Sequence, residues 1–491
     1  MLTILLCATL MRVAFAATTG LGNDESYAVV TSRVLALSYF DHPPMTWWLV
    51  HLSVFLTGSE APLVVRAPFL VFAALSTVLM YRLTARLFTP WAGVLAALMM
   101  ACAPVLGVTS ASWVLPDGPL IAFLLAGTLV LARVLFEPDA HPAGWLLAGL
   151  LGGLAMLSKY HGAFFFIGTF VFLLTSPDHR FWLRRAWPYA GALVALAVFA
   201  PVVVWNAQND FVSLAFQGGR AAAARFQPWM SLVVIGGGAL FLTPWIWVGL
   251  VGSGWRALRA NIRAPRSWLL LCLGCGPILL FPLIAAWSPS KPFFHWAAPG
   301  YLMLFPLLGR AMARRWTYHA ATRRWAFGSA AFVGVAMGAI MILSLVPTLS
   351  AIGAGPPRDP LRELAAWSDL DDQFRQLGLT PDRYPLVVSR IWHEGGKIGY
   401  ALGDRWPIAC IGQDCRGFRF THMEQGREGA DAVVVVSGIP RAEEIAVLAS
   451  HFARLETVST FDLRHAGALI GPATILIGHS YHRDGETGGA S

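Results

Sequence analysis

The segment at residues 116–136 reads PDGPLIAFLLAGTLVLARVLF, and it decides the fold class. From Pro119 onward it is apolar apart from Thr128 and Arg133. As a helix, residues 119–136 would be about 27 Å long, close to the ~30 Å of hydrocarbon in a bilayer. Asp117 stands at one end of this span, and Arg133 lies near the other.

Comparable apolar segments recur along the chain, so the sequence predicts a polytopic membrane domain of about eleven transmembrane helices. We expect these spans near residues 1–17, 63–83, 91–110, 119–136, 143–158, 162–175, 188–205, 229–251, 268–286, 296–313 and 326–347. The first span has two interpretations. Residues 14–17 resemble a signal-peptidase site, whereas the lack of a basic residue before the apolar run favours an uncleaved helix.

The composition excludes a soluble globular protein. Only 13% of the residues are charged, against about 25% in soluble domains. The mean hydropathy is +0.59. The net charge of +9 does not indicate a nucleic-acid partner, because the basic residues cluster in short loops between apolar spans.

The charges also predict an orientation. If the N-terminus is cytoplasmic, the arginine-rich loops around residues 180–185, 256–266 and 310–315 fall inside, as the positive-inside rule requires. Most acids of the membrane part then fall outside, including Asp24, Glu25, Asp41 and Asp117. This orientation predicts an inner-membrane protein with its site on the outer, non-cytoplasmic face.

The composition changes after Pro347, and we expect three parts: a membrane domain (1–347), a Gly/Pro linker (348–360) and a small periplasmic α/β domain (361–491). The last part has β-like runs at 385–391, 406–412, 432–438 and 473–478, and a helix-like stretch at 441–451. Outside the cytoplasm, Cys410 and Cys415 can form a disulfide. Cys272 and Cys275 lie in an apolar span and read as packing residues.

The first outer loop, about residues 18–62, is long and reads as ordered. It contains Asp24-Glu25 and a helical stretch to Leu37. Tyr39-Phe40-Asp41-His42-Pro43-Pro44 follows, and then an aromatic-rich stretch from Met45 to Leu56. That last stretch is too short and too polar to span, so we expect it in the plane of the membrane interface.

Further polar groups converge on the same side: Asp117 before a span, Lys159 in a hairpin, Arg220 and Arg225 in a loop, and Lys291 and His295 in another. Carboxylates can act as bases toward a hydroxyl, and cations can hold a phosphate leaving group. Each group also has a simpler interpretation. Asp24 could cap a helix, His42 could belong to a turn, and the cations could contact lipid headgroups.

Four motifs occur in order on this face: Asp24-Glu25, Phe40-Asp41-His42-Pro43-Pro44, Pro116-Asp117 and Ser158-Lys159. In this set the chain resembles the glycosyltransferase C superfamily, specifically family 39-like enzymes such as protein O-mannosyltransferases and lipid A aminoarabinose transferases. The resemblance covers roughly residues 1–300. It implies a polyprenyl-phosphate sugar donor, inversion at the anomeric carbon, and an acceptor that is an envelope glycolipid, glycan or protein.

The resemblance also implies roles for residues. Asp24 would be the catalytic carboxylate, and Asp117 a second essential acid. Glu25 and Asp41 would organise the site or contact the acceptor. A divalent metal cation could be held by Asp41 and His42, although Asp and His replace the usual Glu and Lys there. From their charge and their place on the same face, as well as from the motifs, we expect these residues to bind the donor phosphate: His42, Lys159, Arg220, Arg225, Lys291 and His295.

Two other functions remain open. A transporter or flippase of a lipid-linked saccharide would carry polar positions near the bilayer midplane, whereas here the polar groups gather at one face. A scaffold with a sensory periplasmic domain would not need clustered carboxylates. The sugar and the acceptor are not indicated by the sequence.

Overall fold

The computed structural model describes residues 1–219, 226–287, 294–346, 367, 369–465 and 468–483. The chain divides into two compact units. The helical unit comprises residues 1–14, 36–46 and 66–337, and the sheet unit comprises residues 15–35, 47–65 and 338–491. The predicted linker 348–360 lies outside the described residues, so the three predicted parts stay a prediction.

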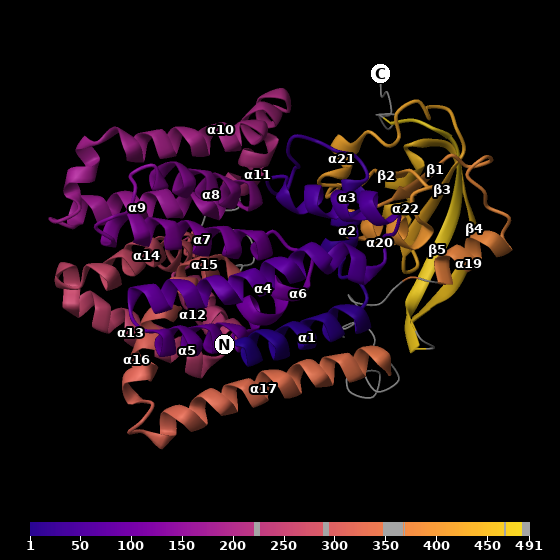
Figure 1. The fold of residues 1–491 in the computed structure, drawn as a ribbon. Coiled ribbons are helices and arrows are strands. Elements are labelled where there is room, and N and C mark those ends of the chain that lie inside the picture. The colour runs from indigo at the N-terminus through magenta and orange to yellow at the C-terminus, as the bar shows by residue number, and fades with distance from the viewer. Residues whose placement is uncertain (220–225, 288–293, 347–366, 368, 466–467, 484–491) are drawn as a thin grey trace. The chain divides into compact units, whose positions relative to one another are not determined.

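The helical unit is built from apolar helices (Figure 1). Their bounds are α1 (Leu2–Thr18), α4 (Pro62–Leu87), α5 (Pro90–Ala101), α6 (Ser110–Ser112), α7 (Asp117–Phe136), α8 (Gly144–Ser158), α9 (Ala163–Thr175), α10 (Ala186–Gln208), α11 (Val212–Gly219), α12 (Trp229–Leu242), α13 (Pro244–Ala260), α14 (Pro265–Ala285), α15 (Ala298–Leu302), α16 (Phe305–Arg315) and α17 (Ala320–Leu345). A π-helix, η1 (Pro104–Thr109), follows α5, and short 3-10 turns join several of the others.

Helices occupy every segment predicted to span, which confirms the fold class. Among the described residues, five helices are long and apolar enough to cross a membrane, or up to eight if each bent pair is one span. Three shorter apolar helices add to these, one of them α3 (Met45–Thr57) and another α8. The number eleven is not confirmed by these lengths, and the side of the membrane on which the tail lies stays a prediction.

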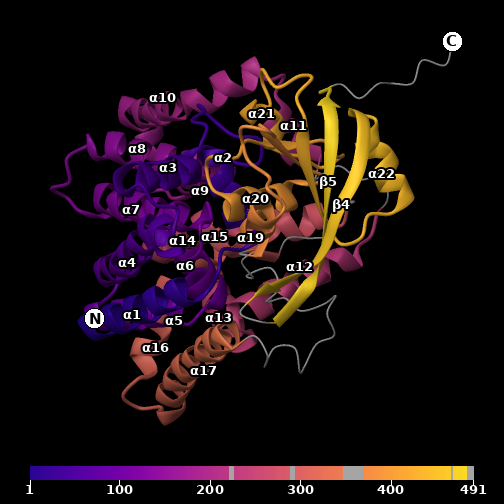
Figure 2. The same ribbon diagram turned by 90° about the vertical axis from the view of Figure 1, so that its right-hand side faces the viewer.

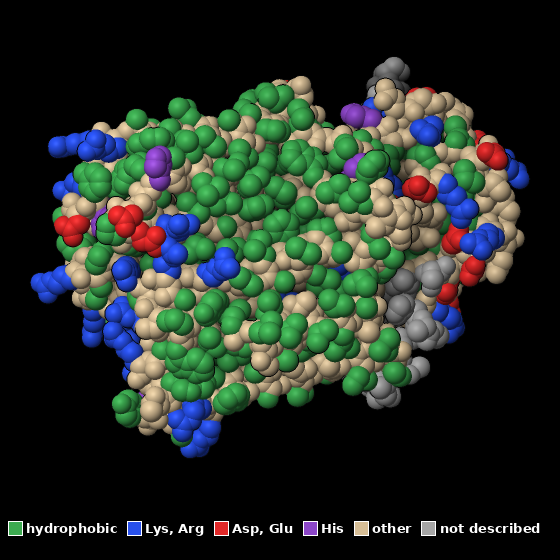
Figure 3. Space-filling view, in the orientation of Figure 1, with side chains coloured by type: hydrophobic (Ala, Val, Ile, Leu, Met, Phe, Trp, Pro, Cys, Tyr) green, Lys and Arg blue, Asp and Glu red, His purple; other side chains and the backbone are tan. Residues whose placement is uncertain are grey.

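The surface of the helical unit is largely apolar (Figure 3). Large side chains such as Phe170, Leu193, Leu232 and Phe327 are exposed on its helices. Lys and Arg side chains gather at one end of these helices, at the left of the view. An apolar belt with a basic end is the distribution expected of a bundle surrounded by lipid.

One predicted span is bent sharply. Residues 229–251 form α12 and α13, whose axes make an angle of 110°. The break is at Thr243, which has a φ of 66° and precedes Pro244. The residue before a proline is disfavoured in the helical conformation, so the sequence stops one helix here and Pro244 starts the next.

A second predicted span, 91–110, also bends, by 86°, where α5 gives way to η1 at Pro104. The buried guanidinium of Arg12 donates hydrogen bonds to the carbonyl of Gly107, at 2.9 Å, and to the hydroxyl of Thr77, at 3.4 Å. An arginine inside an apolar helix needs such partners, because an unpaired buried charge is costly. Arg12 therefore ties α1 to the π-helical segment.

The sheet unit contains a five-stranded mixed sheet of order β2-β1-β3-β5-β4. Its strands are β1 (Leu386–Ser389), β2 (Ile408–Cys410), β3 (Ala432–Ser437), β4 (Phe452–His465) and β5 (Ala468–Tyr481). Strand β1 pairs in parallel with β2 and β3, whereas β5 is antiparallel to both β3 and β4. The long β4–β5 ribbon forms one edge (Figure 2).

Helices cover both faces of this sheet (Figure 2). On one face, Leu448 of α22 (Ala442–Ala449) packs with Val388 and Val434 in the buried core. On the other, α20 (Trp392–Leu402) contacts β1, β2 and β3. The helix α19 (Asp369–Gln376) completes the unit. The predicted small α/β domain is thus confirmed, including four of its strands, while β4 was not predicted.

Two segments of the first outer loop belong to the sheet unit: α2 (Asn23–Ser32) and most of α3. The indole of Trp47 donates to the Thr31 hydroxyl at 2.8 Å, and a ring nitrogen of His51 bonds the Ser32 carbonyl at 2.9 Å. The loop is therefore ordered, as its sequence predicts.

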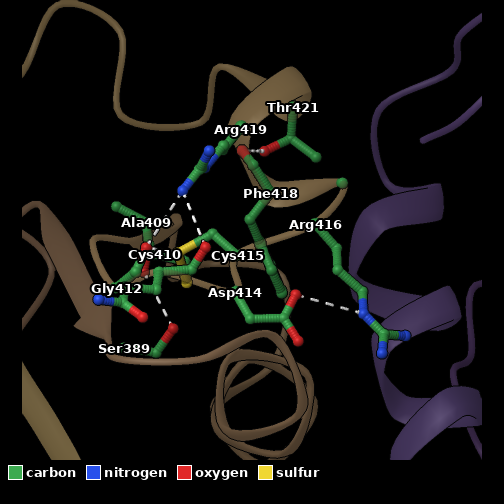
Figure 4. The surroundings of a disulfide bond; sticks show 12 residues. Ser389, Ala409, Cys410, Gly412, Asp414, Cys415, Arg416, Phe418, Arg419 and Thr421 are labelled. Carbon is green, nitrogen blue, oxygen red and sulfur yellow. Dashed lines mark hydrogen bonds and ion pairs between the residues drawn. A yellow bond between two sulfur atoms is a disulfide. The ribbon is translucent and has the colours of Figure 1, made fainter. Parts of the chain in front are cut away.

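The predicted disulfide is present. Cys410 and Cys415 are bonded, with their Cα atoms 5.4 Å apart (Figure 4). The bond joins the end of β2 to the loop before α21 (Phe418–Thr421). In the same place the Ser389 hydroxyl donates to the Ala409 carbonyl, and Arg419 donates to the Gly412 and Gln413 carbonyls.

Candidate functional site

An ion pair lies at the predicted outer end of the helical unit. The Lys159 ammonium donates to both carboxylate oxygens of Asp117, at 3.0 and 2.9 Å. The side chains are only 3% and 10% exposed. Because a buried charge is costly unless it is paired, each residue depends on the other for its ionised form.

Local structure explains why these two side chains meet. Asp117 is the first residue of α7, where a carboxylate is favoured by the helix dipole. Lys159 directly follows the last residue of α8, in extended conformation, where a cation is favoured. Helices α7 and α8 pack along each other, so the start of one lies beside the end of the other.

Three histidines lie in this region. His161 is close to Lys159, Asp117, His42 and His295. Its ring stacks on Phe281 at 4.9 Å and lies 6.2 Å from Trp296. Beside it is a small cavity lined by residues of α7, α9, α14 and α15. The structure therefore brings together four predicted site residues, namely His42, Asp117, Lys159 and His295.

The segment that carries Asp41 and His42 packs on α11. The Phe40 ring lies 4.6 Å from that of Phe216, and the Gln217 amide donates to the Asp41 carbonyl. Helix α11 is also tied to the Lys159 turn, since the hydroxyls of Tyr160 and Ser213 are 2.7 Å apart. Helix α11 thus links the Asp41-His42 motif to the hairpin that holds Lys159.

Asp24 and Glu25 lie in the first turn of α2, in the sheet unit. The N-cap is Gly22, so the interpretation of Asp24 as the capping residue is wrong. Glu25 has that role instead: it is buried, and its carboxylate accepts a hydrogen bond from the Gly22 amide at 2.9 Å. Asp24 is exposed.

The remaining predicted residues are not placed or not supported. Arg220, Arg225 and Lys291 lie outside the described residues. Within the described part of the chain, no group of three or more His, Cys, Asp or Glu side chains is arranged to hold a metal ion. Asp41 and His42 alone offer few ligands for a resident cation.

Sequence reasoning missed three residues. His161, in the hairpin next to Lys159, is not among the predicted site residues. The side chain of Arg66, near the start of α4, is fully buried. Lys397 lies in the C-terminal part, 4% exposed, and donates to the Leu21 carbonyl at 2.5 Å. The only sequence signal for Lys397 was a lone lysine within an apolar, glycine-rich stretch.

Comparisons with known proteins agree with this architecture. Residues 41–205 match the family described as dolichyl-phosphate-mannose-protein mannosyltransferase. This range contains the Asp41-His42, Asp117 and Lys159 motifs. A search of curated proteins by sequence finds no match.

Solved structures share the fold. ArnT from Cupriavidus metallidurans, in the apo state, is similar with a TM-score of 0.65 and 17% identity over 97% of both chains. The same protein bound to undecaprenyl phosphate gives a TM-score of 0.64 and the same coverage. An Archaeoglobus fulgidus oligosaccharyltransferase, in complex with Zn and sulfate, gives 0.50 and 14% identity over 93% of this chain and 72% of the other. The chain therefore has the fold of the glycosyltransferase C superfamily, as its ordered motifs predict.

Proposed function

We propose that this protein transfers a sugar from a polyprenyl-phosphate donor to an envelope acceptor on the periplasmic face of the bacterial inner membrane. The observation that carries the proposal is the buried Asp117–Lys159 pair with His42, His161 and His295 around it. A cation held beside several ring N–H donors suits a phosphate leaving group. The undecaprenyl phosphate bound by the similar ArnT supports a donor of this class.

The reaction needs one bond to form and one to break. The acceptor hydroxyl attacks the anomeric carbon while the bond from that carbon to the phosphate oxygen breaks, with inversion. The hydroxyl proton passes to a carboxylate, for which we assign Asp24, and polyprenyl phosphate leaves with its negative charge balanced by Lys159. Asp117 keeps Lys159 ionised and oriented. The proposed reaction uses these side chains and does not require a metal ion.

The acceptor is an envelope glycolipid, glycan or protein. The basic residues gathered at one end of the helices support placing the donor site at the opposite, outer end. Membrane lipid surrounds the helical unit, whose exposed surface is largely apolar.

The test uses the full-length purified protein in lipid nanodiscs with a mixture of polyprenyl-phosphate sugars. Mass spectrometry follows the release of free polyprenyl phosphate and the appearance of the glycosylated acceptor, with envelope lipid extract as the acceptor source. We expect both products only when donor and acceptor are present. In sealed proteoliposomes of the same protein, movement of an intact lipid-linked saccharide across the bilayer, without cleavage, would establish the transporter function instead.

A further inference from the structure

The residues that hold α2 come from the end of the chain. We infer that α20 and the loop closed by the Cys410–Cys415 disulfide are a positioning device for α2, the helix that carries Asp24. The inference rests on the proposed function, in which Asp24 is the base, and adds positioning residues to it: Lys397, Gly396 and Tyr27.

The first contact is at the start of α2. The Lys397 ammonium, buried in the sheet unit, donates to the carbonyl of Leu21 at 2.5 Å. Leu21 stands directly before the N-cap Gly22, and Asp24 follows within one turn. A buried ammonium is costly, so its bond to this carbonyl fixes the point at which α2 begins.

The second contact is at the other end of α2. Arg33 donates to the Gly399 carbonyl at 3.0 Å, and its guanidinium also bonds both carboxylate oxygens of Glu60, at 2.8 and 2.7 Å. The Tyr400 hydroxyl donates to the Glu60 carbonyl at 3.2 Å. Helix α20 therefore holds α2 at both of its ends, directly and through Glu60.

Between these ends the two helices touch through glycines. A Cβ atom added at Gly396 would lie 2.7 Å from the Tyr27 amide nitrogen and 2.8 Å from the Tyr27 Cα. One added at Gly399 would lie 2.9 Å from the Val30 side chain. Because backbone atoms of α2 meet Gly396, any larger residue there must shift α2 and α20 relative to each other.

The fourth contact involves the disulfide loop. The Gly417 amide donates to the Tyr27 hydroxyl at 2.8 Å. The Tyr27 ring packs edge-on against Trp392 and Phe418, with centroids 5.3 and 5.6 Å away. Gly417 follows Cys415 by two residues, so the disulfide restrains the loop that supplies this donor (Figure 4).

If these contacts position Asp24 for the reaction, small displacements of α2 should lower kcat without unfolding the protein. The sharpest variant is Gly396→Ala, which keeps the helix and adds one methyl group against the α2 backbone. Tyr27→Phe keeps the ring and removes only the bond to Gly417. Matched controls are Gly334→Ala, where an added Cβ meets nothing within 4 Å, and Tyr384→Phe, a buried tyrosine before β1.

The experiment measures transfer by the full-length variants, with kcat and donor KM determined separately, together with thermal unfolding and hydrogen exchange of the α2 amides. For Gly396→Ala we expect kcat to fall by roughly 10- to 100-fold, as for a displacement of about 1 Å, with donor KM within about twofold of wild type. For Tyr27→Phe we expect a smaller loss of kcat and faster exchange in α2. Both controls should match the wild type.

Each outcome decides one point. Variants that retain wild-type kcat and wild-type exchange overturn the positioning role. A parallel rise in donor KM would also overturn it, since α2 would then contribute to donor binding. If the wild type itself transfers no sugar, the proposed function fails. Unchanged exchange in Lys397→Met would separately disprove that α20 holds α2, and unchanged exchange in Tyr27→Phe would disprove that the loop after Cys415 does.

Discussion

The Lys159 ammonium donates hydrogen bonds to both carboxylate oxygens of Asp117, and both side chains are buried. Breaking such a pair from either side leaves one buried charge uncompensated. For Lys159→Met we expect a loss of about 3–5 kcal/mol in the free energy of unfolding, measured by chemical denaturation in detergent.

The double variant Asp117→Asn/Lys159→Met separates stability from function. Removing both charges should restore most of the lost stability, because no unpaired ion remains buried. Donor binding should not recover, since the cation assigned to the phosphate is gone. A double variant with full transfer activity would remove Lys159 from the proposed site.

Asp24→Asn tests the base. Asparagine preserves the size of the side chain, and the helix is capped through Gly22 and Glu25, so α2 should persist. Turnover should fall by roughly 10²- to 10⁴-fold with the unfolding temperature unchanged. Glu443→Gln is the control, because Glu443 is also an exposed acid in the first turn of a helix, α22. Equal activity of Asp24→Asn and Glu443→Gln would exclude Asp24 as the base.

Glu60 joins the first loop to the end of α2 through Arg33. Its carboxylate holds Arg33 through two hydrogen bonds, and both side chains are mostly buried. Glu60→Gln should lower the free energy of unfolding of the sheet unit by about 1–3 kcal/mol, as for a lost charge-assisted bond. The pair of Arg405 and Asp371, in which the arginine is 58% exposed, offers a comparison: Arg405→Gln should change stability by well under this amount. Equal changes in the free energy of unfolding for Glu60→Gln and Arg405→Gln would show that the Arg33–Glu60 pair is no more stabilising than the Arg405–Asp371 pair.

His479 predicts a pH dependence of the sheet unit. Its ring bonds Glu456 at 3.2 Å and Asp431 at 2.8 Å, and these carboxylates raise the pKa of His479 above 6.5. Since the folded value is raised, the stabilisation is fully present below the unfolded pKa and is lost as pH rises through the folded pKa. Unfolding midpoints measured from pH 5 to 9 should therefore fall across this range, and the fall should shrink in His479→Gln. An identical pH profile in the variant would contradict the assignment.

Much of the architecture could be predicted from the sequence, because a helix that crosses the lipid bilayer needs a long run of apolar residues. A run such as 119–136 can only be a helix in a bilayer, and the structure has α7 there. Strand β4 was not predicted, because Phe452–His465 is an edge strand with charged residues and lacks a regular apolar face. The sharp bend at Thr243 depends on one residue before a proline inside an apolar run, and hydropathy does not detect it.

The candidate site was predictable only in part. Asp117 and Lys159 were both chosen from motifs, but their pairing depends on how α7 and α8 pack. Lys397 could not be found, since its partner Leu21 is 376 residues away and offers only a backbone carbonyl. A contact of that kind leaves no motif in the sequence.

The bond between Tyr27 and Gly417 joins residues 390 positions apart. During synthesis at the ribosome, α2 is made near the beginning and α20 near the end. A nascent chain released before Trp392 would insert its helices and still lack the partner that holds the Asp24 helix. The surroundings of Asp24 are thus completed last, and under the proposed function an unfinished product in the membrane would be unable to transfer sugar.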